Sequence, residues 1–433
     1  MHRKFVHVFY PLIMLTWCMA IGEPAFAQTP DGDTLRLTLP QAKERFLKNN
    51  LSLLIQRYQV DQAKAAIITA RLFDNPQFSI DNVLYNPQTK KFFDMSYNGG
   101  EYSAQLSQLF QTAGKRNKNI QLAQISAQQE QYQFYDLLRT LSFTLNTDFY
   151  KIYFLEQSEK VYQEEINSLA TTLKAFKEQY DKGNIALKEV LRIQSQLYSL
   201  QSEQNDLRDQ IQDAQTEFKL LIRASVGTYV SPQNDFDATE KSIVGQVNYQ
   251  RLLDSALTNR ADLKNARSGV DYSNVNLSLQ KAMAVPDVTV QLGYDKQGSY
   301  IRDYNSAGLA FSLPFFNRNQ GAIKQARIAV DASKAQLQSQ QDQVESDVAT
   351  AYKSALRLEN LYNSFDPKFK YDFNHLIVEV AKNYQKHNIS LLEFLDFYDS
   401  YKTNTLQFNN LQLNRVSSLM QLNYATGTTF FNY

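Results

Sequence analysis

The chain has 433 residues, with 45 Lys and Arg against 44 Asp and Glu, so its formal net charge is +1. This balance argues against a nucleic-acid-binding protein, which carries a basic excess or a basic stripe. The 26 Tyr and 27 Phe exclude a disordered chain, and only 14 Gly and 10 Pro predict long, uninterrupted elements.

Residues 1–27 have the pattern of a secretory signal peptide. Basic residues at 2–4 precede an apolar run at 5–21, and a small-residue cleavage site follows at 25–27. The alternative is an uncleaved N-terminal anchor. Lipidation of Cys18 is disfavoured because a bulky tryptophan precedes it. Cleavage would remove this single cysteine, so the mature chain is expected to have no disulfide and no thiolate metal site.

The remainder consists of two similar halves, 28–230 and 247–433, joined by a linker at 231–246 that is rich in turn-forming residues. The clearest internal match pairs residues 180–191 (YDKGNIALKEVL) with 384–395 (YQKHNISLLEFL). Each half is predicted to contain a helix, two strands and a pair of long helices, so the chain has an internal two-fold repeat.

Alternation of apolar and polar residues predicts strands near 77–86, 101–110, 287–296 and 305–314. Runs of this length can span a bilayer as tilted strands. The alternation is clean in the second half, and its apolar positions are predicted to face lipid: Val288, Val290, Leu292, Ala307, Leu309, Phe311 and Leu313. It is weaker in the first half, where the equivalent positions are Phe78, Ile80, Leu84, Tyr102, Ala104, Leu106 and Leu109.

A helix is expected over 113–180, where proline is absent and Gly114 is the single glycine. At 1.5 Å per residue it would be about 100 Å long. Its counterpart is expected over 320–384, interrupted near Asp366-Pro367. Apolar residues at three- and four-residue spacing favour coiled-coil-like packing of these helices into hairpins.

Four strands cannot cross a membrane as an open sheet, because the unpaired edges would lie in lipid. Pooling strands between subunits solves this problem: two protomers give eight strands, which side chains fill, and three give twelve, which enclose a lumen. The predicted fold is therefore mainly α with a small β part. Three protomers would form a twelve-stranded transmembrane β-barrel that continues as an α-barrel into the periplasm.

The two turn motifs, together with residues 109–116 (LFQTAGKR) and 312–321 (SLPFFNRNQG), resemble the TolC family of outer-membrane efflux channels. The last two stretches resemble the heavy-metal branch, the outer-membrane component of cobalt-zinc-cadmium and copper-silver efflux systems. This resemblance implies a homotrimer in outer-membrane lipid, a sealed periplasmic tip, a periplasmic adaptor (membrane fusion) protein and a proton-driven inner-membrane pump of the RND type. It implies a passive conduit without cofactor.

Both turns are short polar interruptions between long helices, and we expect them to be the periplasmic tips that dock the adaptor. The tip positions are Gly183, Asn184, Ile185 and Leu187 in the first turn, and Asn388, Ile389, Ser390 and Leu391 in the second. One departure from the repeat is that His387 stands where the first turn has Gly183.

Glu393 and Asp396 lie three residues apart, on one helix face. The resemblance makes them an acidic ring that narrows the periplasmic aperture. The family's basic gating partner falls on Ile389, so Lys188 and Arg192 of the first turn are the replacement candidates. The alternative is that all four are ordinary surface charges. The aperture would then be apolar, with candidates Phe394, Phe397 and Tyr398.

No nucleophile elbow, P-loop or dinucleotide-binding motif is present, and the two histidines outside the signal peptide are His375 and His387. We therefore expect neither an enzyme nor a resident metal or cofactor. Two rival functions remain open at this point. One is a multidrug or type I secretion channel, and the other is a periplasmic coiled-coil adaptor without a membrane sheet.

Overall fold

The computed structural model describes residues 33–233, 244–298, 300–366, 368–386 and 388–431. The elements of the first repeat are β1 (Thr34–Leu37), α1 (Leu39–Asn49), α2 (Leu51–Arg71), β2 (Gln77–Asn82), β3 (Tyr85–Asn86), β4 (Lys91–Phe92), β5 (Tyr102–Phe110), α3 (Lys115–Asp181), α4 (Leu187–Ile222) and β6 (Tyr229–Pro232). Those of the second are a 3-10 helix (Val244–Gln246), α5 (Tyr249–Asn259), α6 (Ala261–Met283), β7 (Val288–Asp295), β8 (Tyr304–Ala310), α7 (Gln320–Asn363), α8 (Phe369–Gln385) and α9 (Leu391–Thr426).

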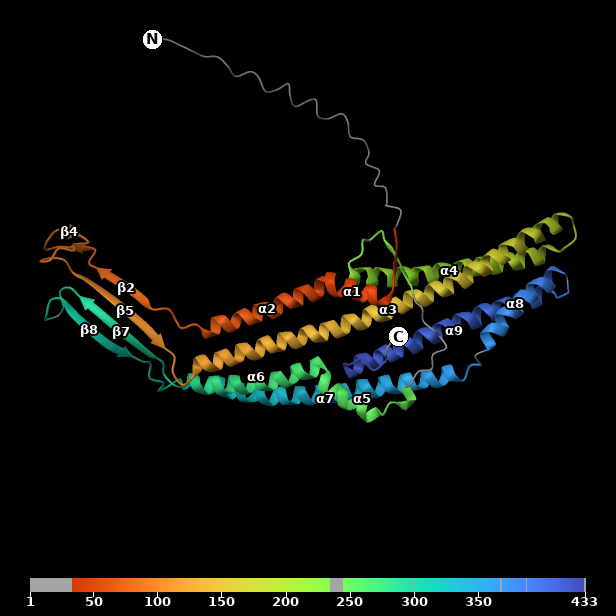
Figure 1. Cartoon of the computed structure of the whole chain (residues 1–433). Coiled ribbons are helices and arrows are strands. Elements are labelled where there is room, and N and C mark those ends of the chain that lie inside the picture. Colours follow the sequence, from red (N-terminus) through yellow and green to blue (C-terminus); the bar gives the residue numbers. More distant parts are fainter. Residues whose placement is uncertain (1–32, 234–243, 299, 367, 387, 432–433) are drawn as a thin grey trace, which may run out of the picture.

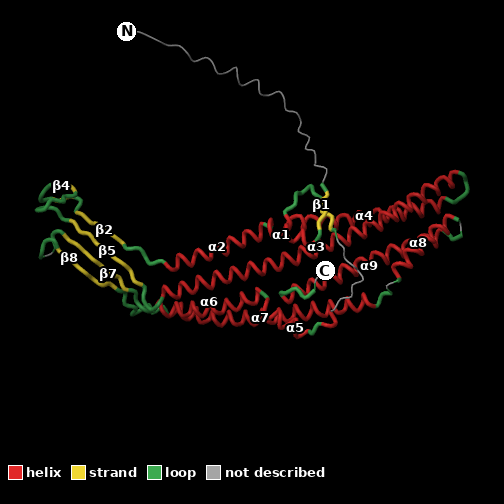
Figure 2. Tube along the Cα trace, viewed as in Figure 1, coloured by secondary structure: helices red, strands yellow, loops and turns green. Residues whose placement is uncertain are grey.

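The molecule is long and curved, with the strands at one end and the two helical hairpin turns at the other (Figures 1 and 2). The α3–α4 and α8–α9 hairpins lie alongside each other, and α3 contacts α9. The predicted mainly helical, two-repeat fold is confirmed. The match extends to element boundaries, because α5 begins and ends 210 residues after α1.

The long helices follow from the scarcity of helix breakers. Helix α3 has 67 residues, which gives a length of about 100 Å. It begins after Gly114, whose left-handed conformation turns the chain from the sheet into the helix. In the second repeat α7 ends at Asn363 and α8 begins at Phe369. The predicted interruption near Asp366 is therefore confirmed, although Pro367 itself lies outside the described residues.

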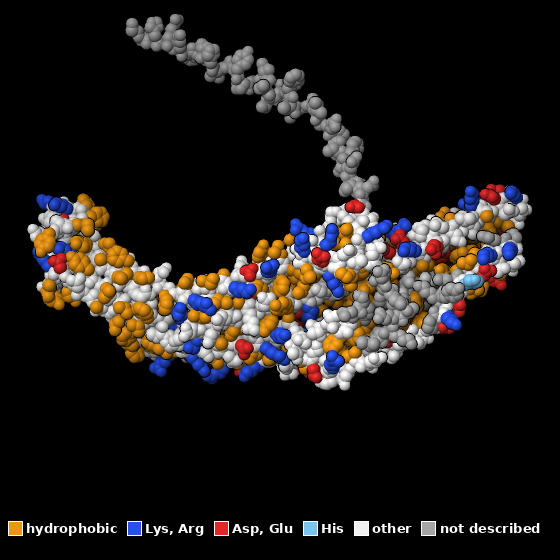
Figure 3. All heavy atoms as spheres, in the orientation of Figure 1, with side chains coloured by type: hydrophobic (Ala, Val, Ile, Leu, Met, Phe, Trp, Pro, Cys, Tyr) orange, Lys and Arg blue, Asp and Glu red, His pale blue; other side chains and the backbone are white. Residues whose placement is uncertain are grey.

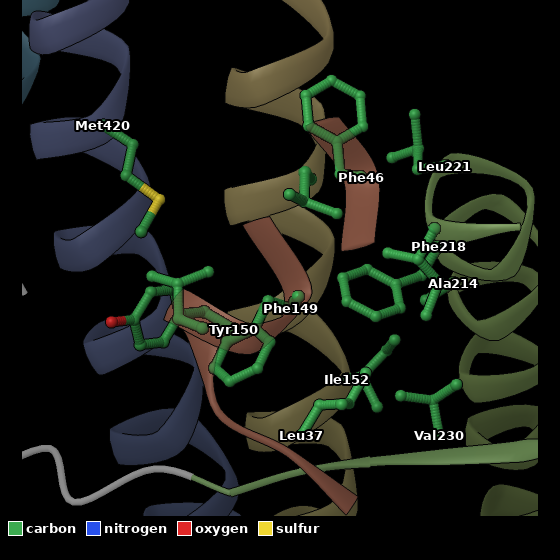
Figure 4. Packing of buried hydrophobic residues seen from close by; sticks show 14 of the residues in the cluster. Leu37, Phe46, Phe149, Tyr150, Ile152, Ala214, Phe218, Leu221, Val230 and Met420 are labelled. Atoms are coloured by element: carbon green, nitrogen blue, oxygen red, sulfur yellow. The ribbon is translucent and has the colours of Figure 1, made fainter. Parts of the chain in front are cut away.

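Short helices and a small sheet surround the middle of the hairpins. Strands β1 and β6 pair in parallel, and the core beside them contains residues of α1, α3, α4 and α9. Figure 4 shows Phe149 of α3 and Phe218 of α4 in this core, with ring centroids 6.2 Å apart. The side chain of Asn50 caps α2 and donates to the Leu221 carbonyl at 3.0 Å, so it ties the break between α1 and α2 to α4.

The four longer strands form one antiparallel sheet in the order β2-β5-β7-β8. Its central pair, β5 with β7, joins the two repeats. Three of the strands lie close to their predicted ranges. The first is shorter than predicted, because β2 ends at Asn82 and the chain then forms a separate small hairpin of β3 and β4. Leu84 is therefore not part of the membrane-length strand.

Two predicted segments fall wholly or largely outside the described residues. The signal peptide at 1–27 is one, and the linker at 231–246 is described only at its ends. Ser231 and Pro232 at its start belong to β6 and pair with Arg36 and Leu37 of β1. Ordered pairing thus extends two residues past the predicted start of the linker. Among the described helices, none combines the length and the apolar character needed to cross a membrane.

Candidate functional site

The turn between α3 and α4 is closed by main-chain hydrogen bonds around Gly183. The N–H of Gly183 donates to the Tyr180 carbonyl at 2.8 Å, and the N–H of Asn184 donates to the Gln179 carbonyl at 2.9 Å. These two bonds form a Schellman motif, whose key residue takes a left-handed conformation that glycine tolerates best. Gly183 has a φ of +78°, so it allows the long helix to stop and reverse.

The turn between α8 and α9 keeps the equivalent bond. The N–H of Asn388 donates to the Asn383 carbonyl at 2.9 Å. The side-chain amides add matching contacts, Asn388 to Asn383 at 3.1 Å and Asn184 to Gln179 at 2.7 Å. His387, the counterpart of Gly183, lies outside the described residues. The two turns therefore share the hydrogen bond that fixes the reversal, in agreement with their sequence match.

Glu393, one of the proposed gate residues, caps helix α9. The Ser390 N–H and hydroxyl each donate to its carboxylate at 2.8 Å, and the Glu393 N–H donates back to the Ser390 hydroxyl at 3.2 Å. This is a capping box. The bonds from Ser390 hold the pKa of Glu393 below its ordinary value. The sequence signal for this cap is a Ser followed by a Glu three residues later, at Ser390 and Glu393.

The other gate candidates, Asp396, Lys188 and Arg192, are exposed on the protomer. Within the described residues of one protomer, no ion pair joins either basic residue to Glu393 or Asp396. The protomer thus presents these charges at its hairpin end without pairing them. A contact between neighbouring protomers remains a prediction.

The two hairpin turns rest on one shared apolar cluster. Half-buried Ile185, Ile389 and Leu391 pack against it, whereas the remaining tip positions are exposed: Gly183, Asn184, Leu187, Asn388 and Ser390. At its centre the Phe394 ring stacks on Tyr384, with centroids 4.2 Å apart. Phe394 is only 2% exposed. The interpretation of Phe394 as an alternative aperture residue is therefore wrong, because its ring fills the space between the hairpins.

The sheet at the other end has one apolar and one polar face. Directly paired residues of antiparallel strands share a face. The apolar face contains the rows Phe78–Leu106–Leu292–Ala307, Ile80–Ala104–Tyr294–Asn305 and Gln108–Val290–Leu309. The opposite face contains Gln77–Ser107–Gln291–Gly308 and Ser79–Gln105–Gly293–Ser306. Leu109 pairs with Thr289 on the polar face, contrary to its predicted grouping with Leu106.

The apolar face is open to its surroundings. Phe78 is 65% and Leu309 is 69% exposed, and Figure 3 shows apolar side chains gathered over the strand end of the molecule. Phe311 and Leu313 are exposed too but lie beyond Ala310, where β8 ends.

A polar joint fixes the sheet to the helices, and sequence reasoning missed it. The buried Lys115 ammonium lies 2.8 Å from the Asp287 carboxylate and 2.7 Å from the Val285 carbonyl. The N–H of Thr112 donates to the same carboxylate at 2.8 Å. The pair is 172 residues apart in sequence, and neither residue has a distinctive pattern.

No group of three or more metal-ligating side chains comes together in the part of the chain that the structure describes.

Comparison with known proteins identifies this architecture. The model of the outer membrane efflux protein family matches residues 43–222 and 252–428, which are most of the two repeats. The chain belongs to the outer membrane efflux protein family. It is an outer-membrane channel of the TolC type and not an enzyme. Channels of this family form trimers and work with an adaptor and an inner-membrane pump.

Individual relatives are distant. The chain is 21% identical over 301 residues to the cobalt-zinc-cadmium resistance protein CzcC of Cupriavidus metallidurans, covering 68% of each chain. The outer membrane protein VceC of Vibrio cholerae has the same fold, with a TM-score of 0.70, 18% identity, and coverage of 91% of this chain and 97% of VceC. CusC gives a TM-score of 0.71 at 15% identity, covering 92% and 94%.

Proposed function

We propose that three copies of this efflux channel assemble into a conduit in which the sheets close a twelve-stranded barrel and the hairpins form a tunnel. The observation that carries the proposal is the amphipathic sheet with two unpaired outer edges, β2 and β8. A single sheet of this kind cannot lie in lipid, because its edge N–H and C=O groups would stay unsatisfied. Joining β8 of one copy to β2 of the next satisfies those groups and turns the polar face toward the lumen.

The hairpin turns then lie at the periplasmic end, where they would dock a periplasmic adaptor. The exposed polar residues of both turns and the shared apolar cluster beneath them support this placement, because the cluster gives the docking surface a rigid base. The adaptor would connect the channel to a proton-driven inner-membrane pump of the RND type.

For the cargo, we propose heavy-metal cations. The similarity to CzcC over two thirds of both chains supports this assignment. A ring of three Asp396 carboxylates would also attract cations to the tunnel mouth. Deleting the gene should make the host sensitive to cobalt, zinc, cadmium or copper. Unchanged metal tolerance combined with new drug sensitivity would support a multidrug channel instead.

Single cysteines at the turns test the docking surface. Asn184→Cys and Asn388→Cys should each crosslink to the adaptor in intact cells, because both positions are exposed at the hairpin ends. Removal of the signal peptide would leave the mature chain without another cysteine, so the reaction is site-specific. Asn98→Cys, in the loops between strands, serves as the control. Crosslinking from position 98 but from neither turn would contradict the placement.

Asp396→Ala should increase conductance in planar bilayers and weaken block by divalent cations. Unit charges 4 Å apart in water interact by about 1 kcal/mol, so block should weaken by about fivefold for each carboxylate that the blocking cation contacts. Asp213→Ala is the matched control, because Asp213 is an exposed acid toward the far end of α4 from the hairpin turn. Glu393→Gln should have a smaller effect, because its carboxylate is engaged by Ser390. If divalent cations block the Asp396 variant and the parent channel equally, these acids are ordinary surface charges and do not line the aperture.

A further inference from the structure

Glu165, in the part of α3 that leads to the hairpin turn, is a buried acid without a hydrogen-bond partner for one of its oxygens. Its exposed fraction is 4%, and its Oε2 atom has no partner among the described residues. Buried carboxylates in folded proteins are almost always paired or hydrogen-bonded, because desolvating a charge is costly. An apolar residue at this position would avoid the desolvation cost, so we expect the carboxyl group of Glu165 to have a function of its own.

Charged groups from both neighbouring helices face Glu165. Helix α4 contributes Glu203 and helix α9 contributes Asp399 and Lys402, while Tyr162 is the nearby titratable group of α3 itself. The Lys402 ammonium lies 3.1 Å from each of the Glu203 and Asp399 carboxylates. The Tyr162 hydroxyl donates to Glu203 at 3.2 Å. Two carboxylates thus contact the Lys402 ammonium directly, and, within the described residues, Glu165 feels the charges of all three groups without a hydrogen bond from the ammonium.

The charge of this cluster depends on a single proton. Burial raises the pKa of Glu165 to about 7, with Asp399 and Glu203 adding to the effect and Lys402 opposing it. When Glu165 is protonated, the carboxylates of Glu203 and Asp399 face the single Lys402 ammonium, which leaves one excess negative charge. When Glu165 is ionised, the cluster gains a second excess negative charge on this buried side chain. The packed arrangement is therefore most stable at low pH and weakens as pH rises through about 7.

The cluster lies where the two hairpins meet. Asp399 and Lys402 are near the start of α9, and one turn of α3 beyond Glu165 the Ser168 hydroxyl donates to the Tyr398 hydroxyl at 3.2 Å. Separating α9 from α3 would expose the two buried groups of the cluster, Glu165 and Lys402, to water. Ionised Glu165 gains from such exposure, whereas protonated Glu165 does not.

We propose that Glu165, with Glu203, Asp399 and Lys402 around it, forms a proton-sensitive latch that holds α9 against the α3–α4 hairpin. At low pH the latch keeps the two hairpins packed, and at higher pH it releases α9. The latch acts on the relative position of the hairpins and does not depend on which cargo the channel carries.

The test must report on the α3–α9 contact alone, because Asp148 is a second buried acid whose pKa burial raises to about 7. A thermal melting curve would combine the titration of Asp148 with that of Glu165. Thiol labelling at the contact avoids this problem. Ser168→Cys gives a thiol at the α3–α9 contact, and Thr171→Cys gives an exposed thiol nearby on the same helix. The ratio of their maleimide labelling rates in the purified channel cancels the intrinsic pH dependence of thiols. It should rise about tenfold or more between about pH 5.5 and about pH 8.5.

Glu165→Gln keeps the shape of the protonated acid and cannot ionise. In this background the ratio should stay flat, within about twofold over the same range. Glu164→Gln, at the exposed neighbouring position, should leave the rise intact. A flat ratio in the parent channel, or a rise that persists in Glu165→Gln, would overturn the latch.

Discussion

Leu292→Arg is expected to remove most of the assembled channel from the outer membrane. Leu292 lies in the middle of β7, a central strand, in a row with Phe78, Leu106 and Ala307 that crosses the whole sheet. If this face contacts lipid, an arginine near the bilayer midplane costs about 2–4 kcal/mol in each protomer. A trimer would carry that cost three times. The measurement is the amount of trimer in the outer-membrane fraction.

Gln291→Arg is the matched control for this prediction. It introduces the same side chain one position earlier in the same strand, on the opposite face, where its row is Gln77, Ser107 and Gly308. That face is predicted to line the aqueous lumen, so trimer should form at the parent level. If Gln291→Arg abolished assembly and Leu292→Arg did not, the two faces of the sheet would be assigned the wrong way round.

Glu359→Ala is expected to lower the free energy of unfolding by about 3–5 kcal/mol, the usual cost of breaking a buried ion pair by removing one of its two side chains. Glu359 of α7 accepts from the Arg415 guanidinium of α9 at 3.0 Å, and the two side chains are 5% and 4% exposed. The guanidinium also lies 4.1 Å from the centre of the Tyr362 ring. Denaturant unfolding of the purified channel, followed by circular dichroism, measures the change.

Two controls separate the buried pair from charge loss in general. Glu379→Ala breaks the exposed ion pair with Lys382, and exposed pairs contribute little, so no measurable change is expected. The double variant Glu359→Leu/Arg415→Met removes both buried charges. It should recover most of the lost stability, because apolar replacements of a buried pair are often neutral. A double variant as unstable as Glu359→Ala would show that the loss comes from packing.

Local patterns in the sequence were sufficient for the elements and for the repeat. The scarcity of proline and glycine predicts the long helix α3, which has 67 residues. Alternation predicts the strands β7 and β8 and the face that their apolar residues share. Both properties arise from residues close together in the chain. They therefore remain visible in a single sequence without knowledge of the tertiary structure.

Contacts between distant segments could not be predicted in the same way. Lys115 with Asp287, and Glu359 with Arg415, are ordinary charged residues until the fold brings them together. Phe394 was considered for the aperture because it follows a turn, but the neighbouring hairpin covers it. The family resemblance assigns Glu393 to the acidic ring, and this role stays a prediction; the hydrogen bonds of its carboxylate within the helix cap depend on local structure that the resemblance does not describe.

The most direct test of the trimeric conduit is a crosslink between the two free edges of the sheet. Ser79→Cys in β2 and Ser306→Cys in β8 lie in the same row but three strand spacings apart within a protomer, which is about 14 Å. A thiol crosslinker too short for that distance can join only neighbouring protomers. We predict a ladder of covalent dimers and trimers that ends at the trimer. Absence of crosslinked species, a ladder that ends at the dimer, or one that continues past the trimer would contradict the account.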